Sequence, residues 1–232
     1  MESPTMAIDY WFPTVIYREM LTPSADTTQA MLDYVNKFRF KHKETYSVTG
    51  DTVNEYRIAE QPEFSWLNKE VLRHCYLYLE EYGLDTNKLC IFVSKAWPVV
   101  CNPAKIAKED CVIQKHNHAN SHLSVVFYLQ TDRNKGGEIT FHNSPTHPIR
   151  YVPFAPLLKE QKIPSLDCID YKPIHNQLLI FPSSVEHEVS LYYGAISRYS
   201  ITYDIIITGK ETLDGDNEMC VINPKNWKEL HA

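Results

Sequence analysis

The sequence feature that most limits the fold of this chain is a change in the pattern of residue types after Lys88. Beyond it, short runs rich in β-branched and aromatic residues alternate with polar or proline-containing turns. Five runs predict strands, at residues 89–93, 123–129, 138–141, 177–181 and 199–207. Short strands at this spacing are typical of a sandwich or barrel.

Two helices are expected before these strands. Ser24 and its neighbours offer N-cap groups for a helix that runs to about Lys41. A second helix is expected over residues 63–83, with Gly83 at its C-cap. Its apolar residues recur at three- and four-residue steps, at Leu67, Val71, Cys75, Tyr78 and Tyr82. An opening strand is expected over residues 9–17.

These elements predict an α+β fold class with a mainly β core over about residues 88–208. Gly136-Gly137 marks a tight turn within it, and the long segment 145–173 is expected to act as a substrate-binding loop. The chain has 232 residues, which suits one domain spanning 1–232.

Composition excludes several classes of protein. The net charge of −6 argues against a nucleic-acid partner. No apolar run approaches the ~20 residues that span a bilayer, so no membrane partner is expected. The six cysteines form no CxxC pair, and the N-terminus lacks a secretory signal. We therefore expect free thiols and a cytoplasmic protein, with oligomers left open.

Three histidines stand where they can bind a metal ion. His116-Asn117-His118 precedes the 123–129 run, and His187 follows the 177–181 run. On an extended backbone, residues i and i+2 point to the same side, so His116 and His118 can converge. A third ligand from a distant strand would leave open positions, as in non-haem Fe(II) oxygenases. The HxH spacing alone suits zinc or copper equally well, and also fits histidines that are merely hydrogen-bonded at strand ends.

A longer series of motifs narrows these alternatives. In chain order the motifs are His116-Asn-His118, Ser124-Val-Val-Phe-Tyr-Leu129, Gly136-Gly-Glu-Ile-Thr-Phe141, Leu178-Leu-Ile-Phe-Pro182, His187-Glu-Val189 and Arg198-Tyr-Ser-Ile-Thr-Tyr203. The series resembles the Fe(II)/2-oxoglutarate-dependent dioxygenase superfamily. Within it, the pattern is most similar to prolyl-hydroxylase-like bacterial and phage proteins that carry HxH in place of HxD. The resemblance implies a double-stranded β-helix, or jelly roll, with N-terminal helices packed on it.

The resemblance also implies a ligand set. His116 and His187 match the two iron histidines, and His118 occupies the position where most relatives have Asp. His118 can be a neutral third ligand, which we favour, or it can leave the iron to two histidines and water. A third alternative starts the ligand frame at His118, with Asn120 in the carboxylate position.

The same resemblance assigns the co-substrate pocket. Arg198 matches the basic residue that binds the distal carboxylate of 2-oxoglutarate, and a guanidinium offers such a group a bidentate fork. Tyr128 matches a tyrosine that hydrogen-bonds this carboxylate, and Ser200 and Tyr203 are expected to line the pocket. The implied cofactors are Fe(II) and 2-oxoglutarate, with ascorbate as a candidate auxiliary.

The implied reaction is decarboxylation of 2-oxoglutarate to succinate and CO2, coupled to hydroxylation of a second substrate. A protein side chain is the first expectation for that substrate, and a small molecule the second. Two rivals remain: a three-histidine dioxygenase that does not use 2-oxoglutarate, and a non-catalytic binding module. Arg198, eleven residues after His187, favours the 2-oxoglutarate enzyme over both.

Overall fold

The computed structural model describes residues 13–41, 57–101, 112–143 and 167–210, with the single residues 159 and 225. Its helices and strands, in chain order, are β1 (Tyr17–Met20), α1 (Ala25–Lys41), α2 (Ser65–Glu80), β2 (Leu89–Cys101), β3 (Ile113–His116), β4 (Leu123–Gln130), β5 (Ile139–His142), β6 (Cys168–Tyr171), β7 (Gln177–Pro182), β8 (His187–Val189) and β9 (Arg198–Gly209). Three 3-10 turns, η1 (Ile58–Glu60), η2 (Pro62–Phe64) and η3 (Thr86–Lys88), flank α2. None of the helices within these ranges is long and apolar enough to cross a membrane.

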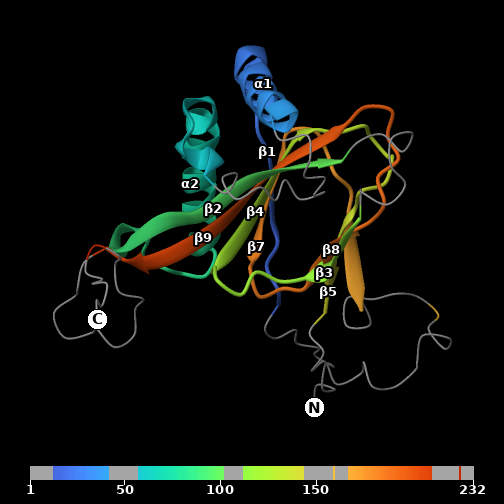
Figure 1. Cartoon of the computed structure of the whole chain (residues 1–232). Coiled ribbons are helices and arrows are strands. Elements are labelled where there is room, and N and C mark those ends of the chain that lie inside the picture. The colour runs from blue at the N-terminus through green and yellow to red at the C-terminus, as the bar shows by residue number, and fades with distance from the viewer. Residues whose placement is uncertain are drawn as a thin grey trace, which may run out of the picture.

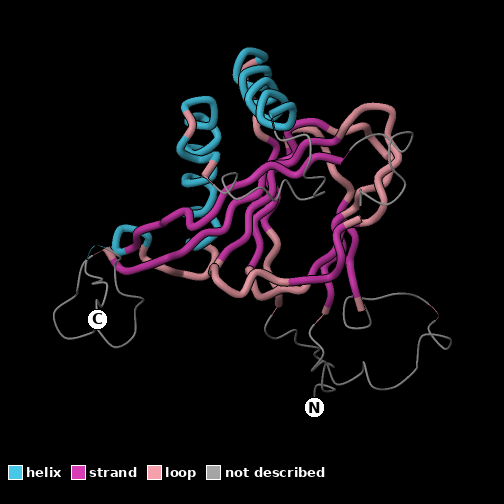
Figure 2. Tube along the Cα trace, viewed as in Figure 1, coloured by secondary structure: helices cyan, strands magenta, loops and turns pink. Residues whose placement is uncertain are grey.

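The strands form two sheets. The larger has the order β1-β7-β4-β9-β2, and the smaller has the order β3-β8-β5-β6. Neighbouring strands in both sheets are antiparallel. Figure 1 shows α1 and α2 on one side of the larger sheet and β3, β5 and β8 on its other side. Figure 2 shows the same division between helices and strands. The α+β class and the double-stranded β-helix expected from the sequence are therefore confirmed.

The central strand β4 divides its side chains between two cores. Leu123, Val125 and Phe127 pack in the core cluster that contains the buried residues of both helices. Val126 and Tyr128 belong to a second cluster, formed with residues of the smaller sheet. This alternation follows from the two-residue period of a strand. The inner face of the larger sheet therefore faces β3, β5 and β8.

The two predicted helices are present, with one error at the end of α2. Ser24 caps α1, because its Oγ accepts a hydrogen bond from the Thr27 amide at 3.1 Å. The four earlier residues of the α2 stripe are buried, but Tyr82 lies beyond the end of α2 and is 50% exposed. Gly83 adopts a φ of +72°, as a C-terminal glycine can without steric cost.

Several short elements differ from the sequence-based expectation. The opening strand expected at residues 9–17 lies partly outside the described residues, and β1 begins only at Tyr17. Most of the expected loop 145–173 also lies outside them, and its last part forms β6. The strands β3 and β8, with four and three residues, were not predicted. Runs this short carry too little periodicity to stand out from turns.

Candidate active site

The ladder between β3 and β8 brings two of the three histidines together. His116 ends β3 and His187 begins β8, and these residues are direct partners across the antiparallel pair. Their ring centroids are 4.4 Å apart. Phe181 packs edge-on against the His187 ring at 4.9 Å and limits its rotation. The register of two very short strands therefore sets this half of the site.

His118 reaches the same point from the turn after β3. Its backbone amide donates to the Ser183 carbonyl oxygen at 2.9 Å, which ties this turn to the segment between β7 and β8. Its Nε2 lies 3.2 Å from Nε2 of His116. One ligand nitrogen from each of His116, His118 and His187 falls within 4.8 Å of the other two. The three predicted histidines thus form one cluster, whereas Asn120 is exposed in the following turn.

Hydrogen bonds orient all three rings in the same sense. Nδ1 of His116 donates to the Gln114 carbonyl oxygen at 2.7 Å, and Nδ1 of His187 donates to the Val185 carbonyl oxygen at 3.0 Å. Nδ1 of His118 lies 2.5 Å from Oδ1 of Asp204. Because a carbonyl oxygen can only accept, the Nδ1 atoms of His116 and His187 carry protons, and in the neutral rings Nε2 keeps the free lone pair. The cluster therefore brings one potential ligand nitrogen of each ring to a common point.

Such a cluster fits a divalent metal ion. Two ligands at right angles, each ~2.1 Å from an ion, are about 3 Å apart, close to the separation seen for His116 and His118. Burial lowers the pKa of His187 to about 4, and burial also lowers the pKa of His116. Both imidazoles are consequently neutral near pH 7, the form in which histidine binds metals.

Arg198 lies at the first position of β9, on the same face of the larger sheet as the cluster's pocket. Its Nη1 donates to the Gly137 carbonyl oxygen at 2.6 Å, and its Nη2 lies 3.1 Å from the Cys101 sulfur. The residue is 1% exposed, and its Nε has no hydrogen-bond partner. Within the described ranges, no carboxylate forms an ion pair with this guanidinium. A buried cation in this state fits an anionic ligand.

The glycine pair explains how Arg198 is accommodated. Gly136 and Gly137 both have a φ of +75°, which confirms the predicted turn. A Cβ at Gly137 would lie 2.3 Å from Nη1 of Arg198, and a Cβ at Gly136 would lie 2.1 Å from the Leu191 carbonyl oxygen. Only glycine allows the guanidinium to approach this turn so closely.

Tyr128 and Ser200 lie beside Arg198, as expected. They are direct partners between β4 and β9, and both line the pocket that also contains Arg198 and the three histidines. Burial raises the pKa of Tyr128 to about 12, so its hydroxyl stays protonated and can donate a hydrogen bond. Tyr203 does not line this pocket, contrary to the expectation. Being three residues after Ser200, it points to the helices, where its hydroxyl donates to Oδ1 of Asn68 at 3.0 Å.

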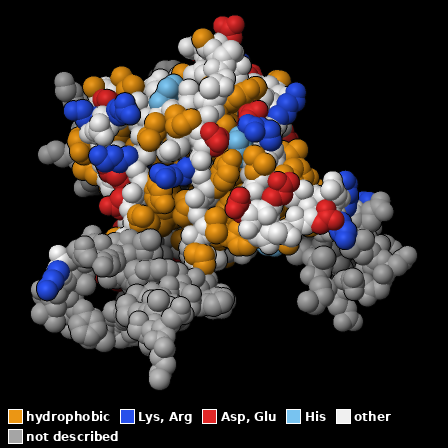
Figure 3. Space-filling view, turned by 180° about the vertical axis from the view of Figure 1, so that it is seen from behind, with side chains coloured by type: hydrophobic (Ala, Val, Ile, Leu, Met, Phe, Trp, Pro, Cys, Tyr) orange, Lys and Arg blue, Asp and Glu red, His pale blue; other side chains and the backbone are white. Residues whose placement is uncertain are grey.

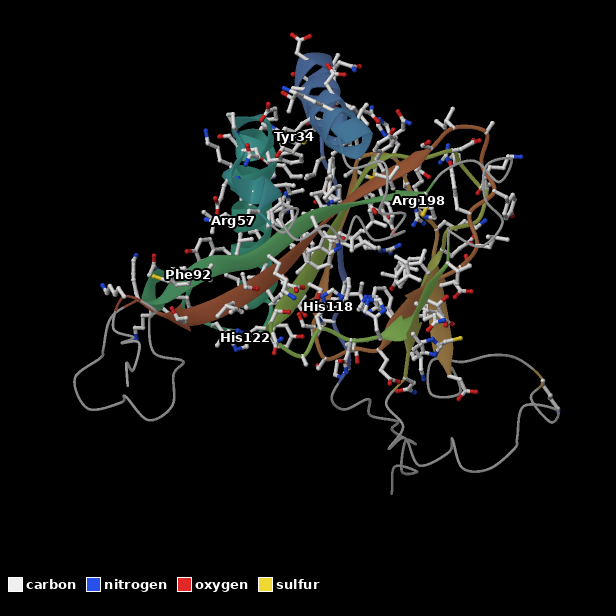
Figure 4. All side chains as sticks on the ribbon, in the orientation of Figure 1. Tyr34, Arg57, Phe92, His118, His122 and Arg198 are labelled. Atoms are coloured by element: carbon white, nitrogen blue, oxygen red, sulfur yellow. The ribbon has the colours of Figure 1, made fainter. Side chains whose placement is uncertain are left out.

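Figure 4 shows His118 and Arg198 in the space between the two sheets, and it shows His122 beside the N-terminal end of β4. The pocket walls between them are largely apolar, and they include Val99, Ile113, Val126, Ile139, Phe181 and Val189. Trp97 stacks on the His118 ring, with centroids 5.8 Å apart. This arrangement can hold a metal ion at one end and a carboxylate at the other.

Sequence reasoning missed Asp204 and Trp97. Asp204 is the only charged residue between Arg198 and Gly209, in a strand that is otherwise mostly apolar. It also continues the two-residue step of Arg198, Ser200 and Thr202. This position could have identified Asp204 from the sequence, because a charged residue on the inner face of a buried strand needs a partner.

Comparisons with known proteins bear on the family and the fold. A family model described as a putative 2OG-Fe(II) oxygenase matches residues 95–204. No curated protein matches the sequence. Solved structures with a similar fold include AviO1 from Streptomyces viridochromogenes Tue57, at 9% identity, with 83% of this chain and 90% of that chain covered and a TM-score of 0.56.

Two further structures widen the range of similar proteins. One is the carbocyclase SnoK from nogalamycin biosynthesis, which is described as alpha-ketoglutarate dependent. It is 11% identical to this chain, the match covers 84% of this chain and 82% of SnoK, and the TM-score is 0.51. A prolyl hydroxylase from Trichoplax adhaerens, solved with a hypoxia inducible factor peptide fragment, has 15% identity, coverages of 82% and 83%, and a TM-score of 0.50. At such identities these likenesses concern the fold.

The fold and the family match over residues 95–204 support the Fe(II)/2-oxoglutarate oxygenase superfamily. The resemblance drawn from the sequence motifs is confirmed at this level, whereas the role of HxH in place of HxD stays a prediction.

Proposed function

We propose that His116, His118 and His187 hold Fe(II), that Arg198 holds 2-oxoglutarate with Tyr128 and Ser200, and that the enzyme hydroxylates a C–H bond. One observation carries this proposal: three imidazoles converge in the same pocket as a buried guanidinium without an anionic partner among the described residues. This chemistry needs a site for the metal ion, which the histidines offer, and a site for the carboxylate of 2-oxoglutarate, which Arg198 offers.

The chain's residues divide the work between them. His116, His118 and His187 would hold the ion and would leave further coordination positions for the co-substrate and O2. Arg198 and the Tyr128 hydroxyl bind the distal carboxylate and so orient the 2-oxo acid along the inner face of β9. The apolar walls exclude water from the reacting groups. When bound, Fe(II) and 2-oxoglutarate let one O2 convert the 2-oxo acid to succinate and CO2 while the second oxygen atom enters the substrate C–H bond.

The substrate remains a matter of proposal, with a protein side chain first and a small molecule second. The similar fold of a prolyl hydroxylase solved with a peptide is consistent with the first, and that of the carbocyclase SnoK with the second. A nucleic-acid substrate is disfavoured by the net charge of −6. On the face drawn in Figure 3, Lys and Arg side chains also stand among Asp and Glu side chains instead of gathering into one basic surface.

Metal binding is tested by removing one ligand. His187→Ala should abolish stoichiometric Fe(II) binding, measured without oxygen by competition with a coloured chelator. His142→Ala is the matched control, because His142 contacts Glu188 at 3.2 Å and stands outside the cluster. Undiminished binding in the His187 variant would remove this residue from the site.

Turnover is tested by measuring succinate. The Fe(II) protein, incubated with 2-oxoglutarate under air, should form succinate slowly, and a true peptide or metabolite substrate should accelerate it. Oxygen consumption that does not depend on 2-oxoglutarate would favour a three-histidine dioxygenase of another kind. No succinate above an Arg198→Met control, over a broad substrate panel, would favour a non-catalytic binding module.

A further inference from the structure

Asp204 is a buried carboxylate that the proposed function does not yet use. It lies on β9, and its side chain is 6% exposed. Its Oδ1 lies 2.5 Å from Nδ1 of His118, and this is the only side-chain hydrogen bond to the carboxylate among the described residues. No Lys or Arg within those ranges forms an ion pair with it. A carboxylate so desolvated requires compensation by a nearby positive charge.

The strand period places Asp204 at the metal end of the pocket. Arg198, Ser200, Thr202 and Asp204 alternate with residues that pack against the helices, so all four point to the inner side of the larger sheet. Arg198 stands at one end of this row, and Asp204 stands at the other, against His118. One strand thus carries the cation for the co-substrate and an anion behind a proposed metal ligand.

The three proposed ligands differ in what accepts their Nδ1 protons. For His116 and His187 the acceptors are neutral backbone carbonyls, of Gln114 and Val185. For His118 alone the acceptor is a carboxylate. His118 also stands where the usual pattern of the superfamily would have Asp. The residue that departs from that pattern is therefore the one that carries a negative charge directly behind it.

We propose that Asp204 is a positioning residue that supplies, through the ring of His118, the negative charge an acidic ligand would otherwise bring to the metal. The inference rests on the proposed three-histidine centre. A carboxylate that accepts the Nδ1 proton fixes the ring orientation and makes Nε2 a stronger donor. The bound divalent ion in turn compensates the buried charge of Asp204. The His118–Asp204 pair thus replaces a single carboxylate ligand with an imidazole ligand that has a carboxylate behind it.

Two substitutions separate charge from geometry. Asp204→Asn keeps an oxygen that can accept from Nδ1 of His118 but removes the charge, and Asp204→Leu removes both. We expect both variants to bind Fe(II) and Co(II) roughly 10–100-fold more weakly than the native protein, the usual range for such partners of metal-binding histidines. Glu188→Gln is the matched control, since it neutralises a carboxylate paired with His142, and it should bind both ions like the native protein.

The readouts are chelator competition without oxygen, the visible absorption spectrum of the Co(II) protein, and urea unfolding of the metal-free protein. Urea unfolding should show that the metal-free Asn variant still folds cooperatively, so that its weaker metal binding is not a loss of fold. Native metal affinity and an unchanged Co(II) spectrum in the Asn variant would overturn the charge role, whatever the Leu variant does. Loss of cooperative unfolding in the metal-free Asn variant would also overturn it, since Asp204 would then serve the fold.

The same measurements separate this inference from the proposed centre. If His187→Ala binds Fe(II) as tightly as the native protein, the three-histidine centre itself fails. If His187→Ala loses the metal while Asp204→Asn retains native affinity, the centre stands and only the role of Asp204 is refuted.

Discussion

Replacement of Arg198 by Met tests the co-substrate pocket most directly. The side chain is 1% exposed, so its charge is held away from water. Its Nη1 donates to the Gly137 carbonyl oxygen, and its buried Nε has no partner. Methionine has a similar length and fills much of the same space, but it offers no donor and no charge. The substitution therefore removes the proposed carboxylate-binding group while disturbing the packing little.

The magnitude follows from this burial. Truncating one partner of a buried, hydrogen-bonded charge pair costs ~2–5 kcal/mol of binding energy, because the other charge is left unpaired. This range corresponds to a dissociation constant for 2-oxoglutarate that is roughly 30- to 5,000-fold higher. The stability of the metal-free protein should respond differently. The lost hydrogen bond to Gly137 costs about 1.5–3 kcal/mol, and relief of the desolvated cation offsets it.

Calorimetric titration of 2-oxoglutarate into the Fe(II) protein, without oxygen, measures the first quantity. Fe(II) affinity and urea unfolding are measured in parallel. We expect a large loss of 2-oxoglutarate binding with Fe(II) binding and metal-free stability close to native. A variant that keeps native affinity for 2-oxoglutarate would refute the assignment of Arg198. A variant that loses stability and both ligands together would show that the guanidinium serves the fold instead.

Three further predictions concern the turn, pH and the core. Gly137→Ala should weaken 2-oxoglutarate binding, because the added Cβ would lie 2.3 Å from Nη1 of Arg198. Gly83→Ala is the control, because Gly83 has a similar φ but nothing within 4 Å of an added Cβ. It should lower the free energy of unfolding by the ~1–2 kcal/mol of backbone strain and leave 2-oxoglutarate binding unchanged. The metal-free protein should lose stability as pH falls from ~6.5 to about 4, by about 2–4 kcal/mol, because His187 resists protonation only when folded. The loss should begin as the pH falls below the unfolded-state pKa of His187 and should be complete near its folded-state pKa. Urea unfolding across this pH range should show a smaller loss in His187→Gln. An unchanged dependence of the unfolding free energy on pH would contradict the depressed pKa of His187. Leu67→Ala should destabilise by ~2–5 kcal/mol in the same assay, whereas Leu77→Ala, at a position 39% exposed, should cost under ~1 kcal/mol; equal losses would contradict the described burial of α2.

Much of the fold was accessible from the sequence. The runs that became β4, β7 and β9 are long enough for their apolar residues and two-residue period to be evident. The same period divides Leu123 from Ser124 between the two faces of β4. It also shows, in retrospect, that Tyr203 could not share a face with Ser200, because three residues separate them. Where the period was applied, the side chains followed it.

The candidate site was accessible only in part. Its histidines, Arg198 and Tyr128 could be identified because their motifs stand in a particular order along the chain. The partners that orient them could not. Asp204 lies 86 residues from His118 in the sequence, and their contact depends on the pairing of β4 with β9 and on the Ser183 carbonyl that holds the turn.

What the sequence by itself determined is therefore the set of elements, their faces and the identity of the reactive groups, since these follow from local periodicity and side-chain chemistry. Only the tertiary structure decided how those groups meet. The register of β3 with β8 places His116 opposite His187. The path of the Gly136-Gly137 turn brings the Gly137 carbonyl oxygen to the buried guanidinium of Arg198. Such contacts depend on strand pairings between distant segments, whose free energies come from burial and hydrogen bonding across the whole core and leave no local pattern in the chain.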